Sequence, residues 1–157
     1  MSEEELRKRL NNDFYLRKIV QIEPSCPPEE NLSRQVGYRS CNTQRENFQF
    51  LADFLADVVN IDWSYTNTSV LDIGCGFGEL VRYLRQKKGF QGKYTGIDIL
   101  DAFTKIGSKL QGNDNRNYFI SGDALSYEWK DSQYDFVVCI GAVATNLDYP
   151  EHYGKKH

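Results

Sequence analysis

A glycine-rich turn between a predicted strand and a predicted helix is the feature that most limits the folds open to this chain. Apolar residues dominate 69–73, and Gly74, Gly76 and Gly78 then lead directly into a helical pattern that starts at Glu79. Glycines allow positive φ angles and let ligand atoms approach the backbone, because no Cβ stands in the way. The free N–H groups at the start of the next helix favour an anionic group. The segment therefore predicts a strand–loop–helix unit that binds a ligand.

The spacing of the glycines separates two ligand classes. A dinucleotide fingerprint, G-x-G-x-x-G, requires a glycine where this chain has Glu79, and a carboxylate there is unfavourable beside a pyrophosphate. The pattern is instead D-x-G-x-G-x-G, with Asp72 two residues before the first glycine. Asp72 can meet an ammonium group while the amides of Gly74, Cys75 and Gly76 meet a carboxylate. The loop therefore predicts a receptor for an amino-acid zwitterion, and a nucleotide-dependent dehydrogenase is the weaker alternative.

Short apolar segments and amphipathic helices alternate along the rest of the chain. We expect strands at 69–73, 94–97, 118–121 and 134–140, and helices at 79–88 (ended by Gly89) and 102–110, the latter with Phe103, Ile106 and Leu110 on one face. This alternation predicts a mainly parallel sheet with helices on both faces. The expected fold class is α/β, a Rossmann-like three-layer sandwich that is truncated after about the fourth strand and preceded by N-terminal helices.

The first third of the chain is predicted to be helical. Leu6, Leu10, Phe14 and Ile19 recur at roughly helical spacing, prolines interrupt 23–28, and a second amphipathic pattern runs to about Asn60 with Asn42 or Thr43 as its N-cap. We therefore divide one compact domain into two parts. Residues 1–60 form a helical segment that covers the ligand site, and residues 61–157 form the Rossmann-like core.

Residues 70–80 resemble the first motif of class I S-adenosylmethionine-dependent methyltransferases, and later segments are similar to further motifs of that family. The resemblance implies S-adenosylmethionine as cofactor, and its methionine end is a zwitterion of the kind predicted above. It assigns Asp98, at the end of the second strand, to the ribose hydroxyls and Ile99 to the adenine face. Asp123 and Ala124, after the third strand, are assigned to adenine recognition.

Two further correspondences complete the predicted cofactor site. Residues 134–140 resemble the fourth-strand motif, whose end, at Ile140, lies below the sulfonium. Tyr38 and Gln44 occupy the place where many small-molecule methyltransferases lay a helix over the methionine moiety. No catalytic residue is predicted, because the sulfonium is already activated and a general base is needed only if the acceptor must lose a proton.

Composition and motifs limit which classes of methyl acceptor and binding partner are expected. With 19 basic and 22 acidic residues the net charge is −3, which gives no general attraction to nucleic acid. The segment after the fourth predicted strand lacks the Asn/Asp-Pro-Pro-aromatic signature common among enzymes that methylate exocyclic or amide nitrogens. The cysteines and histidines show no metal-ligand spacing, and no apolar run approaches the ~20 residues that span a membrane. We expect a cytoplasmic protein without a metal, with a small-molecule acceptor favoured over nucleic acid.

The length of the chain leaves two functions open. The family's sheet normally has seven strands, whereas this chain ends after the predicted fourth, before much of the acceptor pocket. We expect a fragment or a shortened form whose apolar edge at 136–140 self-associates, since unpaired edge strands readily pair. One function is an S-adenosylmethionine-dependent methyltransferase. The alternative is a non-catalytic S-adenosylmethionine-binding module that lacks the acceptor half.

Overall fold

The computed structural model describes residues 1–2, 5–6, 8–9, 36, 38, 40–130 and 134–140. Their elements are, in chain order, α3 (Cys41–Val58), β1 (Ser69–Ile73), α4 (Glu79–Lys88), β2 (Lys93–Asp98), α5 (Asp101–Gln111), β3 (Asn117–Ser121) and β4 (Phe136–Val138). The predicted proline-rich loop at 23–28 and the segment after 140 lie outside the described residues. Of the first predicted helix, residues 5, 6, 8 and 9 are described, and they are helical.

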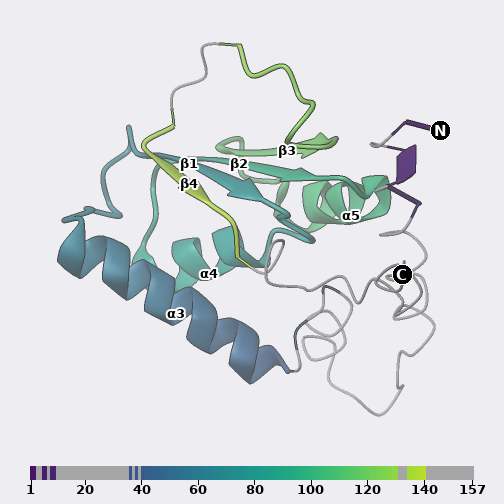
Figure 1. Ribbon diagram of the computed structural model, residues 1–157. Coiled ribbons are helices and arrows are strands. Elements are labelled where there is room, and N and C mark those ends of the chain that lie inside the picture. Colours follow the sequence, from purple (N-terminus) through teal and green to yellow (C-terminus); the bar gives the residue numbers. More distant parts are fainter. Residues whose placement is uncertain are drawn as a thin grey trace, which may run out of the picture.

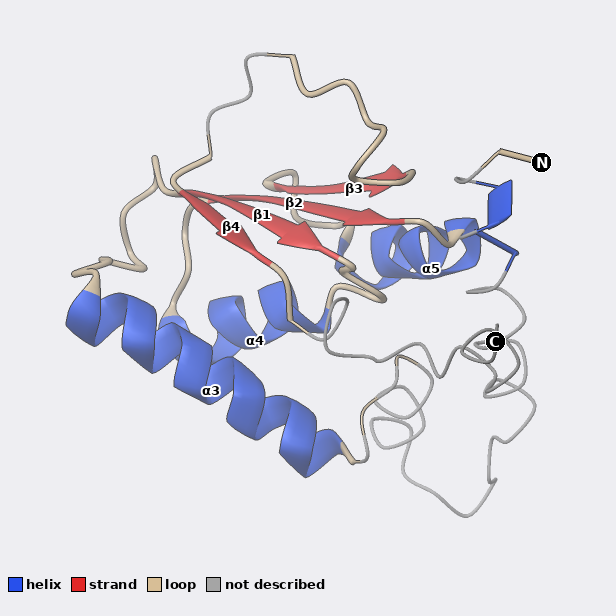
Figure 2. Ribbon diagram, in the orientation of Figure 1, coloured by secondary structure: helices blue, strands red, loops and turns tan. Residues whose placement is uncertain are grey.

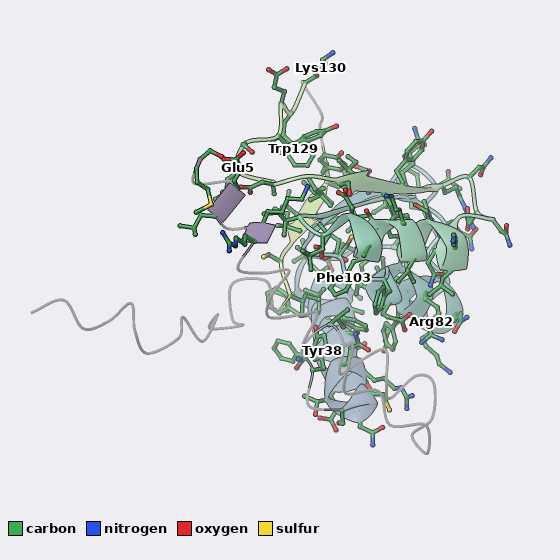
Figure 3. The ribbon with its side chains drawn as sticks, turned by 90° about the vertical axis from the view of Figure 1, so that its right-hand side faces the viewer. Glu5, Tyr38, Arg82, Phe103, Trp129 and Lys130 are labelled. Atoms are coloured by element: carbon green, nitrogen blue, oxygen red, sulfur yellow. The ribbon has the colours of Figure 1, made fainter. Side chains whose placement is uncertain are left out.

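The sheet is entirely parallel, with strand order β3-β2-β1-β4. The connections β1-α4-β2 and β2-α5-β3 run in the same direction, so right-handed crossovers place α4 and α5 on one face, and α3 lies beyond α4 on that side (Figures 1 and 2). The described part of the connection that follows β3, residues 122–130, runs on the opposite face, where Trp129 lies on the other side of the sheet from Phe103 (Figure 3). The predicted α/β, Rossmann-like class is confirmed. Helices on both faces were also predicted, but α3, α4 and α5 all lie on one face, because the two crossovers run in the same direction.

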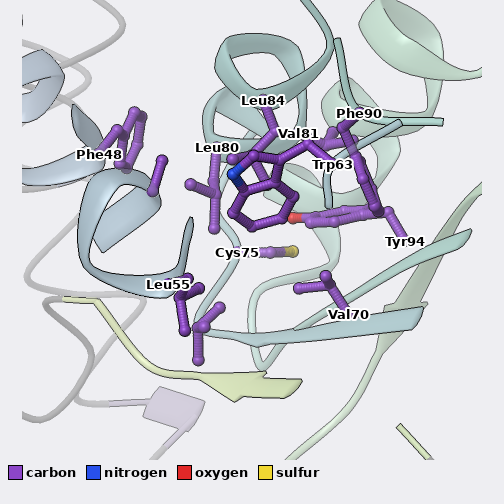
Figure 4. Close-up of a cluster of buried hydrophobic side chains, with 12 residues drawn as sticks. Phe48, Leu55, Trp63, Val70, Cys75, Leu80, Val81, Leu84, Phe90 and Tyr94 are labelled. Carbon is purple, nitrogen blue, oxygen red and sulfur yellow. The ribbon is translucent and has the colours of Figure 1, made fainter. Parts of the chain in front are cut away.

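The main core lies between the sheet and the two helices α4 and α3. It contains Val70 and Tyr94 from the sheet, Leu80, Val81 and Leu84 from α4, and Phe48, Ala52 and Leu55 from α3, with Trp63, Cys75, Phe90 and Val138 (Figure 4). A smaller cluster of Phe77, Leu100 and Phe103 packs beside the glycine loop. The three helices and the loop are thus held against the sheet by burial of apolar side chains, which is the main stabilising contribution in a domain of this size.

The predicted N-cap of α3 was wrong. Ser40, rather than Asn42 or Thr43, caps the helix, because its backbone is extended (φ −157°) and its hydroxyl accepts the Thr43 N–H at 3.1 Å. The pattern of apolar residues located the helix, whereas the cap depends on one backbone conformation that the pattern does not report.

The predicted buried face of α5 was correct only in part. Phe103 is buried, but Ile106 and Leu110 are 37% and 51% exposed, and Gly107 is buried instead. A Cβ at Gly107 would lie 2.8 Å from the ring of Phe119 on β3. The helix therefore turns its glycine toward the sheet to admit an aromatic ring, which leaves two larger apolar residues facing outward.

The fourth strand is shorter than the predicted 134–140 and is an edge of the sheet within the described residues. Val137 is 59% exposed on this edge. Association of two copies through it stays a prediction. No helix in the described part of the chain has the length and apolarity to cross a membrane, and a cytoplasmic location likewise stays a prediction.

Gly92, in the connection between α4 and β2, gives a test of this packing. A Cβ there would lie 2.0 Å from the backbone oxygen of Thr68, which already accepts the Lys93 N–H. We expect Gly92→Ala to lower the free energy of unfolding by about 2–3 kcal/mol. Gly89→Ala is the matched control: its φ is +70° and no atom lies within 4 Å, so it incurs only backbone strain of about 1 kcal/mol. Urea titration compares the two, and equal losses would contradict the steric explanation.

Candidate cofactor site

Three acidic residues of the predicted site lie at the edge of the sheet where the parallel strands have their carboxyl ends. Asp72 is the penultimate residue of β1, Asp98 is the last residue of β2, and Asp123 follows β3 by two positions. The chain passes from β3 across to β4, so the strand order reverses beside β1. Ligands of open parallel sheets bind at carboxyl ends beside such a reversal. The topology therefore places the three acids at the edge where a ligand is expected.

The glycine loop has the backbone that its sequence predicts. Gly74, Gly76 and Gly78 have φ angles of +74°, +55° and +73°, a region that residues with a Cβ rarely adopt. The N–H groups of Gly74 and Cys75 donate to the backbone oxygen of Ile97 at 2.8 and 3.1 Å. These two amides are therefore engaged by β2, and their role toward a carboxylate stays a prediction.

Asp98 joins three segments of the chain. Its Oδ2 accepts the N–H of Gly76 and its Oδ1 accepts the N–H of Leu100, both at 2.9 Å, while its backbone oxygen accepts the N–H of Gly122 at 2.9 Å. The side chain is 9% exposed, and this burial raises the pKa of its carboxyl. A carboxylate has about four acceptor sites, so Asp98 keeps capacity for a further donor such as a hydroxyl. The neighbouring Ile99 is half-buried against the smaller apolar cluster.

Asp72 is the more deeply buried acid, at 3% exposure. The hydroxyl of Tyr94 donates to its Oδ2 at 2.7 Å. Burial raises the pKa of Asp72 to about 7, the hydrogen bond from Tyr94 opposes that rise, and the charge of Asp98 adds to it. Asp72 therefore titrates near neutral pH.

Three further predicted positions, Asp123, Ala124 and Ile140, follow the carboxyl ends of β3 and β4. The Oδ1 of Asp123, which is buried, accepts the N–H of Leu125 at 3.0 Å. The backbone oxygen of Ala124 accepts the indole N–H of Trp129 at 3.0 Å. Ile140, after β4, packs against the main core. The structure thus orders the segments that follow β3 and β4, and their roles toward a cofactor stay predictions.

Gln44 lies in the first turn of α3, and Tyr38 precedes that helix. The Tyr38 ring packs edge-to-face on Phe48, with centroids 6.1 Å apart. Gln44 is buried and lines a groove of about 350 Å³ between α3 and α4, together with Glu79 and Arg82 at the start of α4. The structure therefore places Gln44 next to the helix that the glycine loop begins, and its contact with the methionine moiety stays a prediction.

Two residues near the loop were missed by sequence reasoning. Val36 lies so close to the loop that a Cβ at Gly76 would be 2.8 Å from its Cγ1. Tyr94 supplies the hydroxyl bound to Asp72. A tyrosine within an apolar strand, two residues before Gly96, was a visible signal for a buried polar contact, whereas nothing in the local sequence indicated Val36.

The charge of the site indicates what it can bind. None of the ion pairs among the described residues involves Asp72 or Asp98, although both are buried. Buried carboxylates without a cationic partner are unfavourable, and they mark sites whose counter-charge comes from a ligand. No group of histidine, cysteine or acidic side chains in the described part of the chain could hold a metal ion. The buried carboxylates favour a ligand that bears positive charge.

Comparisons with known proteins bear on this arrangement. Residues 70–153 match the family model described as a methyltransferase domain. The chain is 36% identical over 98 residues to the protein-lysine N-methyltransferase EFM4 of Saccharomyces cerevisiae, a match that covers 60% of this chain and 42% of that protein. It is 29% identical over 70 residues to a demethylmenaquinone methyltransferase of Staphylococcus aureus, covering 45% of this chain and 29% of that protein.

A solved structure extends the likeness to the fold. The plantazolicin methyltransferase BpumL, in complex with S-adenosylhomocysteine, superposes with a TM-score of 0.53 at 20% identity, covering 84% of this chain and 49% of that one. The chain therefore spans less than half the length of each of these three proteins.

Proposed function

This chain belongs to the methyltransferase-domain family, in its class I S-adenosylmethionine-dependent form, and from that premise we propose that it binds S-adenosylmethionine and transfers the methyl group to an acceptor. The observation that carries the proposal is that Asp72, Asp98 and Asp123 lie at the carboxyl ends of three neighbouring strands, where Asp98 binds the glycine loop through the N–H of Gly76. S-adenosylmethionine bears a sulfonium and an ammonium, so a site with buried carboxylates complements its charge.

Each group has a distinct part in the proposed complex. Asp72 faces the ammonium of the methionine end, Asp98 accepts the ribose hydroxyls, and Asp123 with Ala124 recognises adenine. Support comes from the positions of these residues at the carboxyl ends of the strands. The positive φ angles of the loop glycines also place the loop backbone at this end of the sheet. We further propose that residues 1–60 cover this site, because Val36 lies against Gly76.

Alignment is the main contribution that the chain makes to the reaction. When bound, S-adenosylmethionine would supply an activated methyl group for in-line attack by an acceptor, with the thioether sulfur as the leaving group. The protein therefore accelerates the transfer mainly by fixing the position of the methyl donor and excluding water. The N–H groups of Gly76 and Leu100 donate to the Asp98 carboxylate, and these two bonds hold the loop and the start of α5 in fixed relative positions.

We propose a lysine side chain of a protein as the acceptor. The support is the identity to the yeast protein-lysine N-methyltransferase, which extends over 98 residues. A lysine amine attacks only as the neutral base, so the acceptor must lose a proton before transfer. A small-molecule acceptor is the second candidate, favoured by the likeness to the demethylmenaquinone methyltransferase over 70 residues.

Calorimetry and radiolabel transfer test these proposals in turn. We expect the 157-residue chain to release or absorb heat with S-adenosylmethionine and with S-adenosylhomocysteine, and no heat with either would refute cofactor binding. With methyl-labelled cofactor and a cell extract, we expect label in protein that yields methyl-lysine on hydrolysis. Label only in the small-molecule fraction would support the second candidate. Binding without any transfer would support the non-catalytic module.

A further inference from the structure

Tyr94 carries a hydroxyl into the apolar core between the sheet and α4. The side chain is fully buried, and its O–H donates to Asp72 Oδ2 at 2.7 Å. A Cβ added at Gly96 would lie 3.0 Å from the Tyr94 hydroxyl and 2.8 Å from the sulfur of Cys75. Gly96 therefore leaves the space in which the Tyr94 hydroxyl reaches Asp72. Figure 4 shows the hydroxyl end of Tyr94 beside Cys75.

Packing alone does not account for a tyrosine at this position. The Tyr94 ring lies 5.8 Å from the ring of Phe119, and a phenylalanine would make the same contact. A buried hydroxyl needs a hydrogen-bond partner, and a buried carboxylate needs donors. The hydroxyl of Tyr94 and the carboxylate of Asp72 meet both needs in one bond. The specific contribution of the hydroxyl is therefore made to Asp72.

We propose that Tyr94 is a positioning residue for the cofactor, because its hydroxyl fixes the Asp72 carboxylate and stabilises its charged form behind the glycine loop. This inference rests on the proposed function, in which Asp72 meets the ammonium of S-adenosylmethionine. A protonated Asp72 has no charge to attract that ammonium. The Tyr94 hydroxyl thus keeps the acid able to ionise in a place where burial favours its neutral form.

The ionisable groups that act on Asp72 come from β2 and from the glycine loop. Burial and the negative charge of Asp98 raise the pKa of Asp72, whereas the Tyr94 hydrogen bond lowers it. Burial, followed by the charge of Asp72, raises the pKa of both Tyr94 and Cys75 well above their ordinary values. Tyr94 and Cys75 therefore stay neutral across the range in which Asp72 titrates, and Tyr94 remains a donor.

Tyr94→Phe tests the inference with two readouts. The first is the pH titration of the Asp72 side-chain carboxyl carbon by NMR, without cofactor, where we expect a higher pKa than in the wild-type protein. The second is the calorimetric affinity for S-adenosylmethionine between about pH 6 and pH 9. We expect affinity to fall about three- to ten-fold at pH 7 and to approach the wild-type value at the alkaline end, where Asp72 is charged in both proteins.

The matched control is Tyr118→Phe, which removes the hydroxyl of an exposed tyrosine on the neighbouring strand and should change neither readout. An unchanged Asp72 titration in a folded Tyr94→Phe protein would overturn the inference, and so would an affinity loss that is equal at every pH. If wild-type protein gives no heat with S-adenosylmethionine, the proposed function itself fails. The cofactor-free titration then shows separately whether Tyr94 holds the charge of Asp72.

Discussion

Asp72→Asn is expected to make the protein more stable at neutral and alkaline pH while weakening its affinity for S-adenosylmethionine. The asparagine removes a buried charge but keeps an oxygen that can accept the hydrogen bond from Tyr94. We expect a gain of about 2–4 kcal/mol in the free energy of unfolding at pH 8. We also expect affinity to fall at least about ten-fold, because a charged contact to the ammonium is lost.

The direction of the pH dependence follows from the raised pKa. Asp72 has a pKa of about 7 in the folded protein and an ordinary value near 3.8 in the unfolded chain, so the folded state binds the proton more tightly. The contribution of the protonated acid to stability is fully present below pH 3.8 and is lost as the pH rises to about 7. The asparagine of the variant does not titrate. Its gain in free energy of unfolding over the wild-type protein should therefore be small in acid and reach its full size above neutral pH.

Urea titrations at several pH values measure this effect, and Asp114→Asn provides the opposite control. A hydrogen bond from Arg116 is the main cause that lowers the pKa of Asp114 to about 2. Its charge therefore stabilises the folded state above the ordinary pKa, and its removal should lower stability at neutral pH. The quantity to compare is the difference in free energy of unfolding between Asp72→Asn and the wild-type protein. If this difference were no larger at pH 8 than at pH 4, the burial of a charge at Asp72 would be contradicted.

The second large effect is expected at Asp98. Asp98→Ala removes the proposed ribose contact and also the acceptor for the N–H groups of Gly76 and Leu100. We expect affinity for S-adenosylmethionine to fall about 100-fold, since hydrogen bonds to a charged group contribute about 1.5–3 kcal/mol. Asp98→Asn should recover only part of the affinity. Its NH2 group would face one of the two backbone N–H groups, which needs an acceptor and not a second donor.

Asp62→Ala is the matched control for Asp98. Asp62 Oδ1 accepts the N–H of Ser64 at 2.9 Å, the same i to i+2 arrangement as Asp98 with Leu100, but it precedes β1 at the other end of the strand. Calorimetry should give wild-type affinity for this variant, and near-ultraviolet circular dichroism should show native packing for both. Unchanged affinity in a folded Asp98→Ala protein would remove Asp98 from the cofactor site.

Several features of the fold could be predicted because they depend on neighbours in the sequence. Apolar residues dominate 69–73, glycines follow them, and β1 has these bounds. The helix 79–88 ends where Gly89 adopts a left-handed conformation, as expected of a glycine C-cap. Asp98 and Asp123 could be placed at strand ends for the same reason. These signals are local, so one sequence contains them in full.

Other features could not be predicted because they depend on which surfaces meet. The outward position of Ile106 and Leu110 follows from the Phe119 ring that packs against Gly107. The burial of Gln44 follows from the packing of α3 on α4. Periodicity shows that a helix has an apolar stripe, but it does not show which residues a neighbouring ring will displace from the interface.

The sequence by itself determined the parallel α/β fold, the glycine loop and the acids at the strand ends, because each arises from the spacing of residues along one segment. Only the tertiary structure decided how those acids are held. Register brings Val70 opposite Tyr94 and Asp72 opposite Gly96, and the missing side chain at Gly96 lets the Tyr94 hydroxyl reach Asp72. The ionisation of Asp72 on β1 therefore depends on Tyr94 of β2, through a contact that exists only once the sheet has formed.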